Sequence, residues 1–135
     1  MKKVMPLIAG LLIGATVQAD QLIGVNRFVC AASQVQICIE GDSCYLASAW
    51  ELDVPDFVVI DLKKKNISTT KASGLNRSTP FSNVSKDEGL IYLQGVESGR
   101  AFSFVIDEDS GRMTVAVSRD GIAVNVFGIC TSTDL

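Results

Sequence analysis

The 135-residue chain contains no histidine, and this absence excludes more chemistry than any other feature of its composition. Without imidazole the protein lacks Ser-His and Cys-His nucleophile pairs, a proton shuttle near neutral pH, and mixed His-carboxylate zinc sites. Carboxylate chemistry, as in glycoside hydrolysis, needs two acids opposed across a cleft. The 15 acidic residues show no spacing that singles out such a pair. We therefore expect no enzyme, no catalytic residue, no metal site and no cofactor.

Long apolar runs are also missing. The most apolar stretch, residues 7–17, is shorter than the roughly 20 residues that a membrane-spanning helix needs. It follows Lys2-Lys3 and precedes small residues that fit a signal-peptidase site after Ala19. The sequence predicts a signal peptide over residues 1–19 and a single β-domain over residues 20–135. We expect this domain to be periplasmic or secreted in a bacterium, with no stable membrane insertion after cleavage.

Positive charge is scarce in the predicted mature domain. Cleavage would remove Lys2 and Lys3, which leaves 10 basic against 15 acidic residues and a net charge of 10 − 15 = −5. We expect no nucleic-acid partner for so acidic a domain. The domain would hold 135 − 19 = 116 residues, a length that favours one hydrophobic core.

Alternation of apolar and polar residues is the feature that the chain has in abundance. Three segments place apolar side chains at every second position: Phe102, Phe104 and Ile106; Met113, Val115 and Val117; Ile122, Val124 and Val126. This period of two is typical of half-buried strands. Residues 107–111 and 119–121 lie between these segments and are rich in Asp and Gly, which favour tight turns. The segment therefore reads as consecutive hairpins.

Further strands are predicted upstream, although their alternation is weaker. They cover residues 35–39, 57–62, 66–70, 81–85 and 90–96. Residues 42–55 are less regular and include a candidate helical turn at 45–50. Many short strands with frequent turns predict an all-β fold, in which an antiparallel meander forms a small barrel or a sandwich.

The four cysteines are interpreted as structural disulfides, because exported proteins normally oxidise them. Three pairings are formally open. Cys38 and Cys44 are close in sequence, whereas Cys30 and Cys130 lie on the first and last candidate strands, which barrel closure would make neighbours. We favour these two pairs. A bond enclosing about 100 residues would stabilise the fold by roughly 4–5 kcal/mol. A redox or metal site would be expected to show Cys-x-x-Cys spacing or histidine.

Two resemblances are carried by short motifs. Phe28-Val29-Cys30, Pro55-Asp56-Phe57, Leu93-Gln94-Gly95-Val96 and Phe127-Gly128-Ile129-Cys130 resemble segments of small exported proteobacterial proteins of uncharacterised function. That resemblance covers nearly the whole mature chain and implies no activity.

The second resemblance is local. Ser98-Gly99-Arg100-Ala101-Phe102 is similar to the Ser-Gly-x-x-Tyr motif of periplasmic inhibitors of C-type lysozyme, which are small exported β-barrels with a disulfide. In that family the motif loop enters the lysozyme cleft. The resemblance implies a candidate binding loop made of Ser98, Gly99, Arg100 and Phe102, in which Phe102 lacks the hydroxyl of the family's tyrosine.

The sequence as a whole predicts a non-enzymatic, disulfide-stapled β-domain that binds a partner protein, an envelope component or a small ligand. The alternative is a periplasmic inhibitor of C-type lysozyme, and a carboxylate hydrolase is a third reading. A wide apolar mouth would favour a small ligand, and a protruding loop at residues 98–102 would favour inhibition. Two acids about 5–10 Å apart in a cleft would favour hydrolysis.

Overall fold

The computed structural model describes Gly10, residues 22–52 and residues 54–133. Apart from Gly10, the predicted signal peptide lies outside the described residues. The strands are β1 (Arg27–Ile39), β2 (Tyr45–Ala47), β3 (Phe57–Asp61), β4 (Asn66–Thr69), β5 (Ser78–Pro80), β6 (Asn83–Asp87), β7 (Leu90–Glu97), β8 (Arg100–Asp107), β9 (Arg112–Arg119) and β10 (Ile122–Ser132). The 3-10 helices are η1 (Ala49–Leu52) and η2 (Lys71–Ser73). Within this part of the chain, no helix has the length and apolarity needed to cross a membrane.

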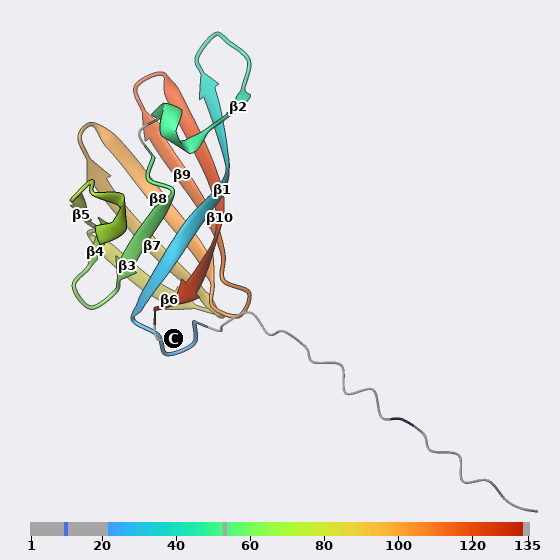
Figure 1. The fold of residues 1–135 in the computed structure, drawn as a ribbon. Coiled ribbons are helices and arrows are strands. Elements are labelled where there is room, and N and C mark those ends of the chain that lie inside the picture. The colour runs from blue at the N-terminus through green and yellow to red at the C-terminus, as the bar shows by residue number, and fades with distance from the viewer. Residues whose placement is uncertain (1–9, 11–21, 53, 134–135) are drawn as a thin grey trace, which may run out of the picture.

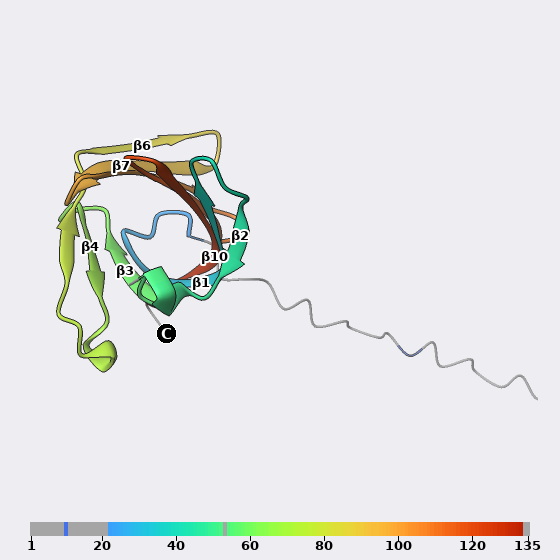
Figure 2. The ribbon, with the colours of Figure 1, turned by 90° about the horizontal axis from the view of Figure 1, so that it is seen from above.

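The strands form one antiparallel sheet in the order β5-β4-β3-β1-β10-β9-β8-β7-β6, with β2 paired to β1. The sheet curls into a half-barrel, as the two perpendicular views show (Figures 1 and 2). Its edge strands, β5 and β6, do not pair with each other, so the described sheet is neither a closed barrel nor a sandwich. The predicted all-β antiparallel meander is confirmed: β7 to β10 follow one another as hairpins, and β10 returns to lie beside β1.

Strand β1 is long enough to have different partners along its two halves. It pairs with β10 throughout, while residues 27–31 pair with β3 and residues 35–37 pair with β2. The register shifts between Ala32 and Gln34, which leaves Ser33 without a register partner. The Ser33 hydroxyl instead donates a hydrogen bond to the Phe127 carbonyl at 3.0 Å. A bulge of this kind bends the strand and increases its twist, so it helps to curl the sheet.

One end of the half-barrel, near the turns at residues 62–65 and 108–111, is closed by packed side chains. Six large apolar residues of the described chain have no exposed surface: Leu22, Phe28, Ile60, Ile91, Leu93 and Ile106. The Leu22 N–H donates a hydrogen bond to the Glu108 carbonyl at 2.7 Å, which ties the segment before β1 to this end. Seen from above, that segment crosses the interior of the ring (Figure 2). We call this the closed end, and the opposite end, at the turns 98–99 and 120–121, the open end.

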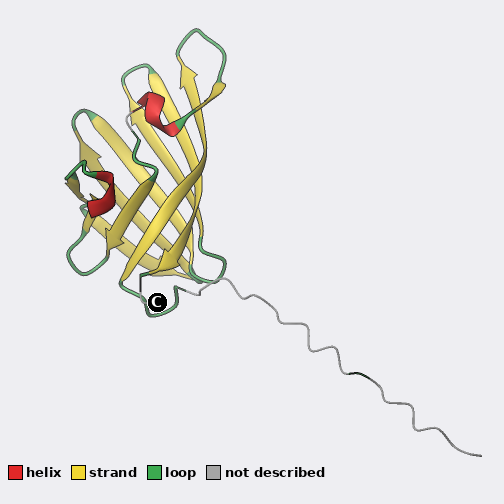
Figure 3. Cartoon of the chain, viewed as in Figure 1, coloured by secondary structure: helices red, strands yellow, loops and turns green. Residues whose placement is uncertain are grey.

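Both favoured disulfides are confirmed. Cys30 and Cys130 are register partners on β1 and β10, and their bond links residues 100 positions apart in the sequence. Both residues are buried on the inner face of the sheet. Cys38 and Cys44 close the short connection between β1 and β2. The bonds therefore join the first strand to the last and secure the hairpin that projects at the open end (Figure 3).

The weakly patterned middle of the chain differs in detail from the sequence prediction. The candidate helical turn at residues 45–50 is strand β2 followed by η1. Strand β5 was not predicted, and the strand expected at 81–85 begins at Asn83. Phe81 is instead a buried crossing residue between β5 and β6, and its N–H donates to the Lys65 carbonyl at 3.0 Å. These strands have three to five residues, too few for alternation to define their ends.

Candidate functional site: the cavity of the half-barrel

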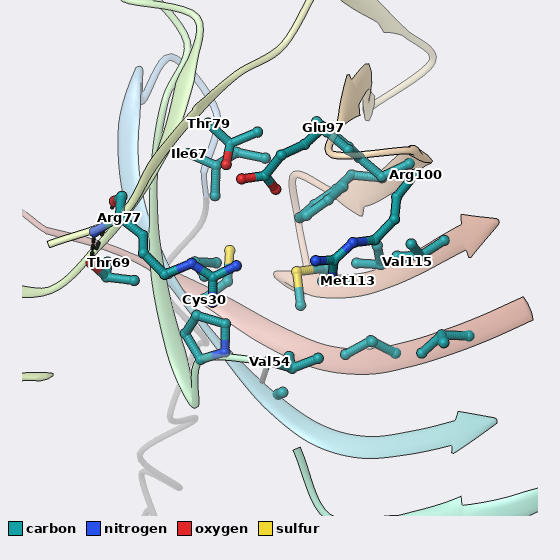
Figure 4. A pocket seen from close by; sticks show the side chains of 18 of the residues that line it. Cys30, Val54, Ile67, Thr69, Arg77, Thr79, Glu97, Arg100, Met113 and Val115 are labelled. Atoms are coloured by element: carbon teal, nitrogen blue, oxygen red, sulfur yellow. Dashed lines mark hydrogen bonds between the residues drawn. The ribbon is translucent and has the colours of Figure 1, made fainter. Parts of the chain in front are cut away.

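A cavity of about 220 Å³ occupies the half of the interior next to the open end (Figure 4). Strands from both arms of the curled sheet line it. On the β8, β9 and β10 side its wall is apolar, with Phe102, Phe104, Val115, Val117, Val124 and Val126. On the other side it is lined by Val58 of β3 and Ile67 of β4, together with Val54 and Pro55. The space is thus enclosed mainly by hydrocarbon.

The cavity exists because the inner face changes its side-chain size along the strands. None of the six fully buried large residues at the closed end lines it. Four of the inner positions of β9 and β10 beside the cavity carry valine, between the larger Met113 and Ile122, and β1 contributes Ala32. Protein interiors pack to a nearly constant density, so small side chains on a wide curved sheet leave space that larger ones would fill. The closed half is therefore a packed core, whereas the open half is hollow.

Two phenylalanines form part of the cavity wall. Phe102 and Phe104 follow each other on the inner face of β8, with ring centroids 5.8 Å apart at 77°. This edge-to-face geometry is a favourable arrangement for aromatic rings. Phe102 lies opposite Gly95 on β7, and a Cβ atom at Gly95 would overlap its ring. Because glycine has no side chain, the Phe102 ring can pack against the backbone at Gly95.

Charged residues occupy inner-face positions where the strands reach the open end. Arg100 lies two positions before Phe102 on β8, and Glu97 is its register partner on β7. Arg119 lies two positions beyond Val117 on β9. All three line the cavity, so each continues the inward-facing set of its strand. Arg119 is exposed and the other two are half-buried, which shows that the cavity reaches solvent here.

A third arginine approaches from the other arm of the sheet. Arg77 precedes β5, and its N–H donates a hydrogen bond to Thr69 Oγ1 at 2.9 Å. The Thr69 N–H in turn donates to the Arg77 carbonyl at 3.0 Å. These bonds fix the Arg77 backbone, and Figure 4 shows its side chain and that of Arg100 extending into the cavity from opposite sides. Thr79, the one buried polar residue of the described chain, also lines this region.

The polar lining is predominantly cationic. Arg77, Arg100 and Arg119 stand against Glu97, the one acid among the described residues that line the cavity, which gives a local charge of 3 − 1 = +2. The chain as a whole has a net charge of −3. In the described structure, the side chains of Glu97 and Arg100 form no hydrogen bond or ion pair, either with each other or with a third residue. The described lining is therefore more positive than the chain as a whole, although acids such as Asp120 and Glu40 lie in the turns around it.

No protein-family model, curated protein or solved structure gives a significant match to this chain. The residues that line the cavity are therefore the guide to its function. Small-molecule sites share the features seen here: an apolar wall, an opening to solvent and a few convergent polar groups.

The structure divides the candidate binding loop predicted at residues 98–102. Ser98 and Gly99 form a two-residue hairpin turn, with φ angles of 48° and 76°, and both are exposed. Two consecutive positive φ values are typical of the tight turns that join paired strands. Arg100 lies in the cavity lining, and Phe102 is 9% exposed inside the half-barrel. The loop residues thus belong partly to the turn and partly to the cavity.

Sequence reasoning identified the inward-facing apolar residues and named Arg100 as a candidate binding residue, but it did not identify Glu97, Arg119 or Arg77. The alternation that places Phe102 and Phe104 inside also places Arg100 inside, and the same holds for Arg119 after Val117. A charged residue at an inward position, in line with the apolar inner-face residues of the same strand, is the sequence signal that could have identified Arg100 and Arg119 as lining residues. Arg77 and Thr79 had no such signal, because β5 is short and its neighbours along the chain are polar.

Proposed function

We propose that the protein binds a small, largely apolar ligand in the cavity of its half-barrel. The observation that carries the proposal is the apolar cavity itself, about 220 Å³ in volume and open at one end. A binding role without chemistry agrees with the absence of histidine. Water in such a space forms few hydrogen bonds with the wall, so its displacement by hydrocarbon is favourable.

Size limits the ligand. Pockets for drug-sized molecules generally measure about 300–1,000 Å³. A cavity of about 220 Å³ is below that range. It suits one short chain or one ring system, or a longer molecule whose end projects into solvent at Arg119. Two-chain lipids are too large to be enclosed.

We further propose that the protein acts in a bacterial periplasm or after secretion. The two disulfides support an oxidising compartment, since such bonds are rare in the reducing cytosol. The predicted signal peptide at residues 1–19 adds the sequence argument. Mass spectrometry of periplasmic material should find a mature chain that starts at Asp20 and is four hydrogens lighter than its reduced form. An intact chain with free thiols in the cytoplasm would contradict this location.

The cavity is favoured over the lysozyme-inhibitor alternative because of where Phe102 lies. In the inhibitor family the aromatic residue of the motif belongs to the loop that enters the lysozyme cleft. Here its counterpart faces the cavity, beside Phe104. Ser98 and Gly99 alone are exposed at the tip, and a two-residue turn offers little surface for a cleft.

The proposed function is tested with a neutral apolar dye, N-phenyl-1-naphthylamine, whose fluorescence rises when it leaves water. We expect the oxidised protein to bind it with one site per chain. Val115→Phe, which adds a ring to the cavity wall, should abolish the signal. Ala116→Phe is the matched control, because Ala116 is the next residue on β9 and its side chain is exposed on the outer face.

Folding is monitored independently, since overpacking costs about 1–3 kcal/mol. Val124→Phe fills the same cavity from β10 and provides a second variant should Val115→Phe unfold. Equal dye fluorescence in the folded cavity variants and in Ala116→Phe would place the dye on the surface. That result would overturn the proposal.

A further inference from the structure

The inner-face charges at the open end define which ligands the cavity would select. We propose that the ligand is a single-chain amphiphile with an anionic head, of which an alkyl carboxylate is the simplest example. Its chain would lie along the apolar wall, and its head would lie at the guanidinium group of Arg100. This inference rests on the proposed function, because it assigns the chemical class of the ligand in the same cavity.

The placement of Arg100 is the first argument. A charged residue at the end of a strand usually points to water, and an outward position was available one residue away, at Ala101. Arg100 instead occupies the inward position in register with Glu97, and it lines the cavity while remaining half-buried. Partial burial of a guanidinium costs solvation energy that no ion pair within the described structure offsets. An anionic head on the ligand would offset it.

The geometry of the polar groups is the second argument. The Arg77 and Arg100 side chains extend into the cavity from opposite sides (Figure 4). Arg77 already has an interaction of its own, so the guanidinium group of Arg100 is the one that a ligand would meet. A guanidinium can donate two parallel hydrogen bonds to one carboxylate, which makes arginine well suited to this head group. Thr79, at the same part of the lining, carries a hydroxyl that can donate a further bond.

Charge balance is the third argument. The lining carries three arginines against Glu97, whereas acidic residues exceed basic ones by 15 to 12 in the chain as a whole. A cationic lining attracts an anionic group inside the cavity although the net charge of the protein repels it. Glu97 works against an anionic head, which makes it the residue whose neutralisation should strengthen binding. A cationic ligand would meet the opposite arrangement.

The volume favours one chain over two. A cavity of about 220 Å³ cannot enclose the paired chains of a membrane phospholipid. The head group would therefore belong to a free single-chain acid. Membrane lipids would not be taken up intact.

The experiment compares three probes that share one alkyl chain: decanoate, decanol and decylamine. Each is titrated against the oxidised protein loaded with N-phenyl-1-naphthylamine, below the concentration at which the probes aggregate. We expect decanoate to displace the dye about tenfold more tightly than decanol, the difference that one charge-assisted hydrogen-bonded contact provides. Decylamine should be the weakest. The advantage of decanoate should shrink as ionic strength rises, because the head lies near solvent.

Variants assign the effect to its residues. Arg100→Gln should reduce decanoate affinity about tenfold, far more than decanol affinity, so that the advantage of decanoate is lost. Glu97→Gln should strengthen decanoate binding and weaken that of decylamine. Arg27→Gln removes the same charge from the exposed start of β1, outside the cavity lining, and should change neither. Arg100→Met, which keeps a long side chain, should match Arg100→Gln and so separates charge from packing.

The outcomes distinguish this inference from the function beneath it. Equal affinities for decanoate and decanol, or a preference for decylamine, would overturn the anionic class while the apolar-ligand function stands. Selectivity for decanoate that survives both Arg100 variants would overturn the assigned role of Arg100. Failure of all three probes, together with failure of the dye to bind, would overturn the proposed function itself.

Discussion

The ring of Phe102 lies against the backbone of Gly95, its register partner on β7. A Cβ atom at Gly95 would overlap the ring, so the ring occupies the space that a side chain at position 95 would need. Because Phe102 also lines the cavity, this contact connects the packing of the sheet to the space available for a ligand.

Gly95→Ala should therefore push the Phe102 ring toward the cavity. We expect a loss of about 1–3 kcal/mol in the free energy of unfolding, the usual cost of overpacking, and weaker dye binding. Gln94→Ala, at the exposed neighbouring position on β7, should be nearly neutral. Phe102→Leu shortens the partner, so the double variant with Gly95→Ala should lose less stability than the sum of the single changes. Additive losses would show that the two residues do not compete for space.

The second prediction concerns the register of β8. Phe104 is 9% exposed on the inner face, and Phe104→Ala should lower the free energy of unfolding by about 3–5 kcal/mol. Ser103 lies on the outer face of the same strand, and Ser103→Ala should be nearly neutral. Chemical denaturation of both variants measures the difference. Similar losses would contradict the inner-face assignment of Phe104.

The inner face of β8 to β10 is also the part of the fold that the sequence predicted best. Each of these strands has eight or more residues, so the period of two repeats often enough to identify one apolar face. The disulfide between Cys30 and Cys130 was predicted because barrel closure would make the first and last strands neighbours. The pairing is confirmed, but these strands are neighbours in the middle of the sheet, not at a closing edge.

Other features could not be derived from local patterns. The open edge between β5 and β6 depends on the crossing at Phe81, a long-range arrangement. The cavity arises from the relation between sheet curvature and side-chain volume, and a one-dimensional sequence shows only the volumes. The motif resemblance singles out Arg100 as a loop residue, whereas its inward position on β8 places it in the cavity lining.

The third prediction compares the two disulfides. The bond between Cys30 and Cys130 closes a span of 100 residues, and that between Cys38 and Cys44 a span of six. In the chain-entropy model these spans correspond to roughly 4–5 and roughly 2 kcal/mol of stabilisation. Replacing each pair by alanine should give losses in that order, and burial of Cys30 and Cys130 should enlarge the first. Denaturation midpoints check the order, and a larger loss for the short bond would contradict it.

The fourth prediction concerns acid stability and the turn between β8 and β9. The backbone N–H of Ser110, followed by that of Asp109 and the charge of Arg112, holds the pKa of Asp107 below its usual value. Both N–H groups donate to Asp107 Oδ1, at 3.0 Å and 2.8 Å. Because this pKa is lowered by folding, its contribution to stability is present above the unfolded-state pKa of about 3.9 and disappears as the pH falls below it.

Asp107→Asn keeps an oxygen that accepts both bonds but cannot ionise. We therefore expect the variant to lose less stability than the wild type when the pH is lowered from 6 to below about 3.9. The measurement is the free energy of unfolding as a function of pH. Asp120→Asn is the control, since this exposed acid lies in the turn between β9 and β10. Parallel pH curves for the wild type and Asp107→Asn would contradict the prediction.

The last prediction concerns the hairpin tip at Ser98 and Gly99. If residues 98–102 acted as an inhibitor loop, the purified domain would slow a C-type lysozyme at micromolar concentration, and replacing Ser98 and Arg100 would abolish the effect. We expect no inhibition at a large molar excess, because the aromatic residue of the motif is turned into the half-barrel, where Phe102 is 9% exposed beside Phe104. Phe102→Tyr sharpens the test, since it restores the hydroxyl of the family motif without moving the ring outward. Inhibition by the wild type that Ser98→Ala removes would assign the function to the loop, whereas inhibition that survives this change would require another surface.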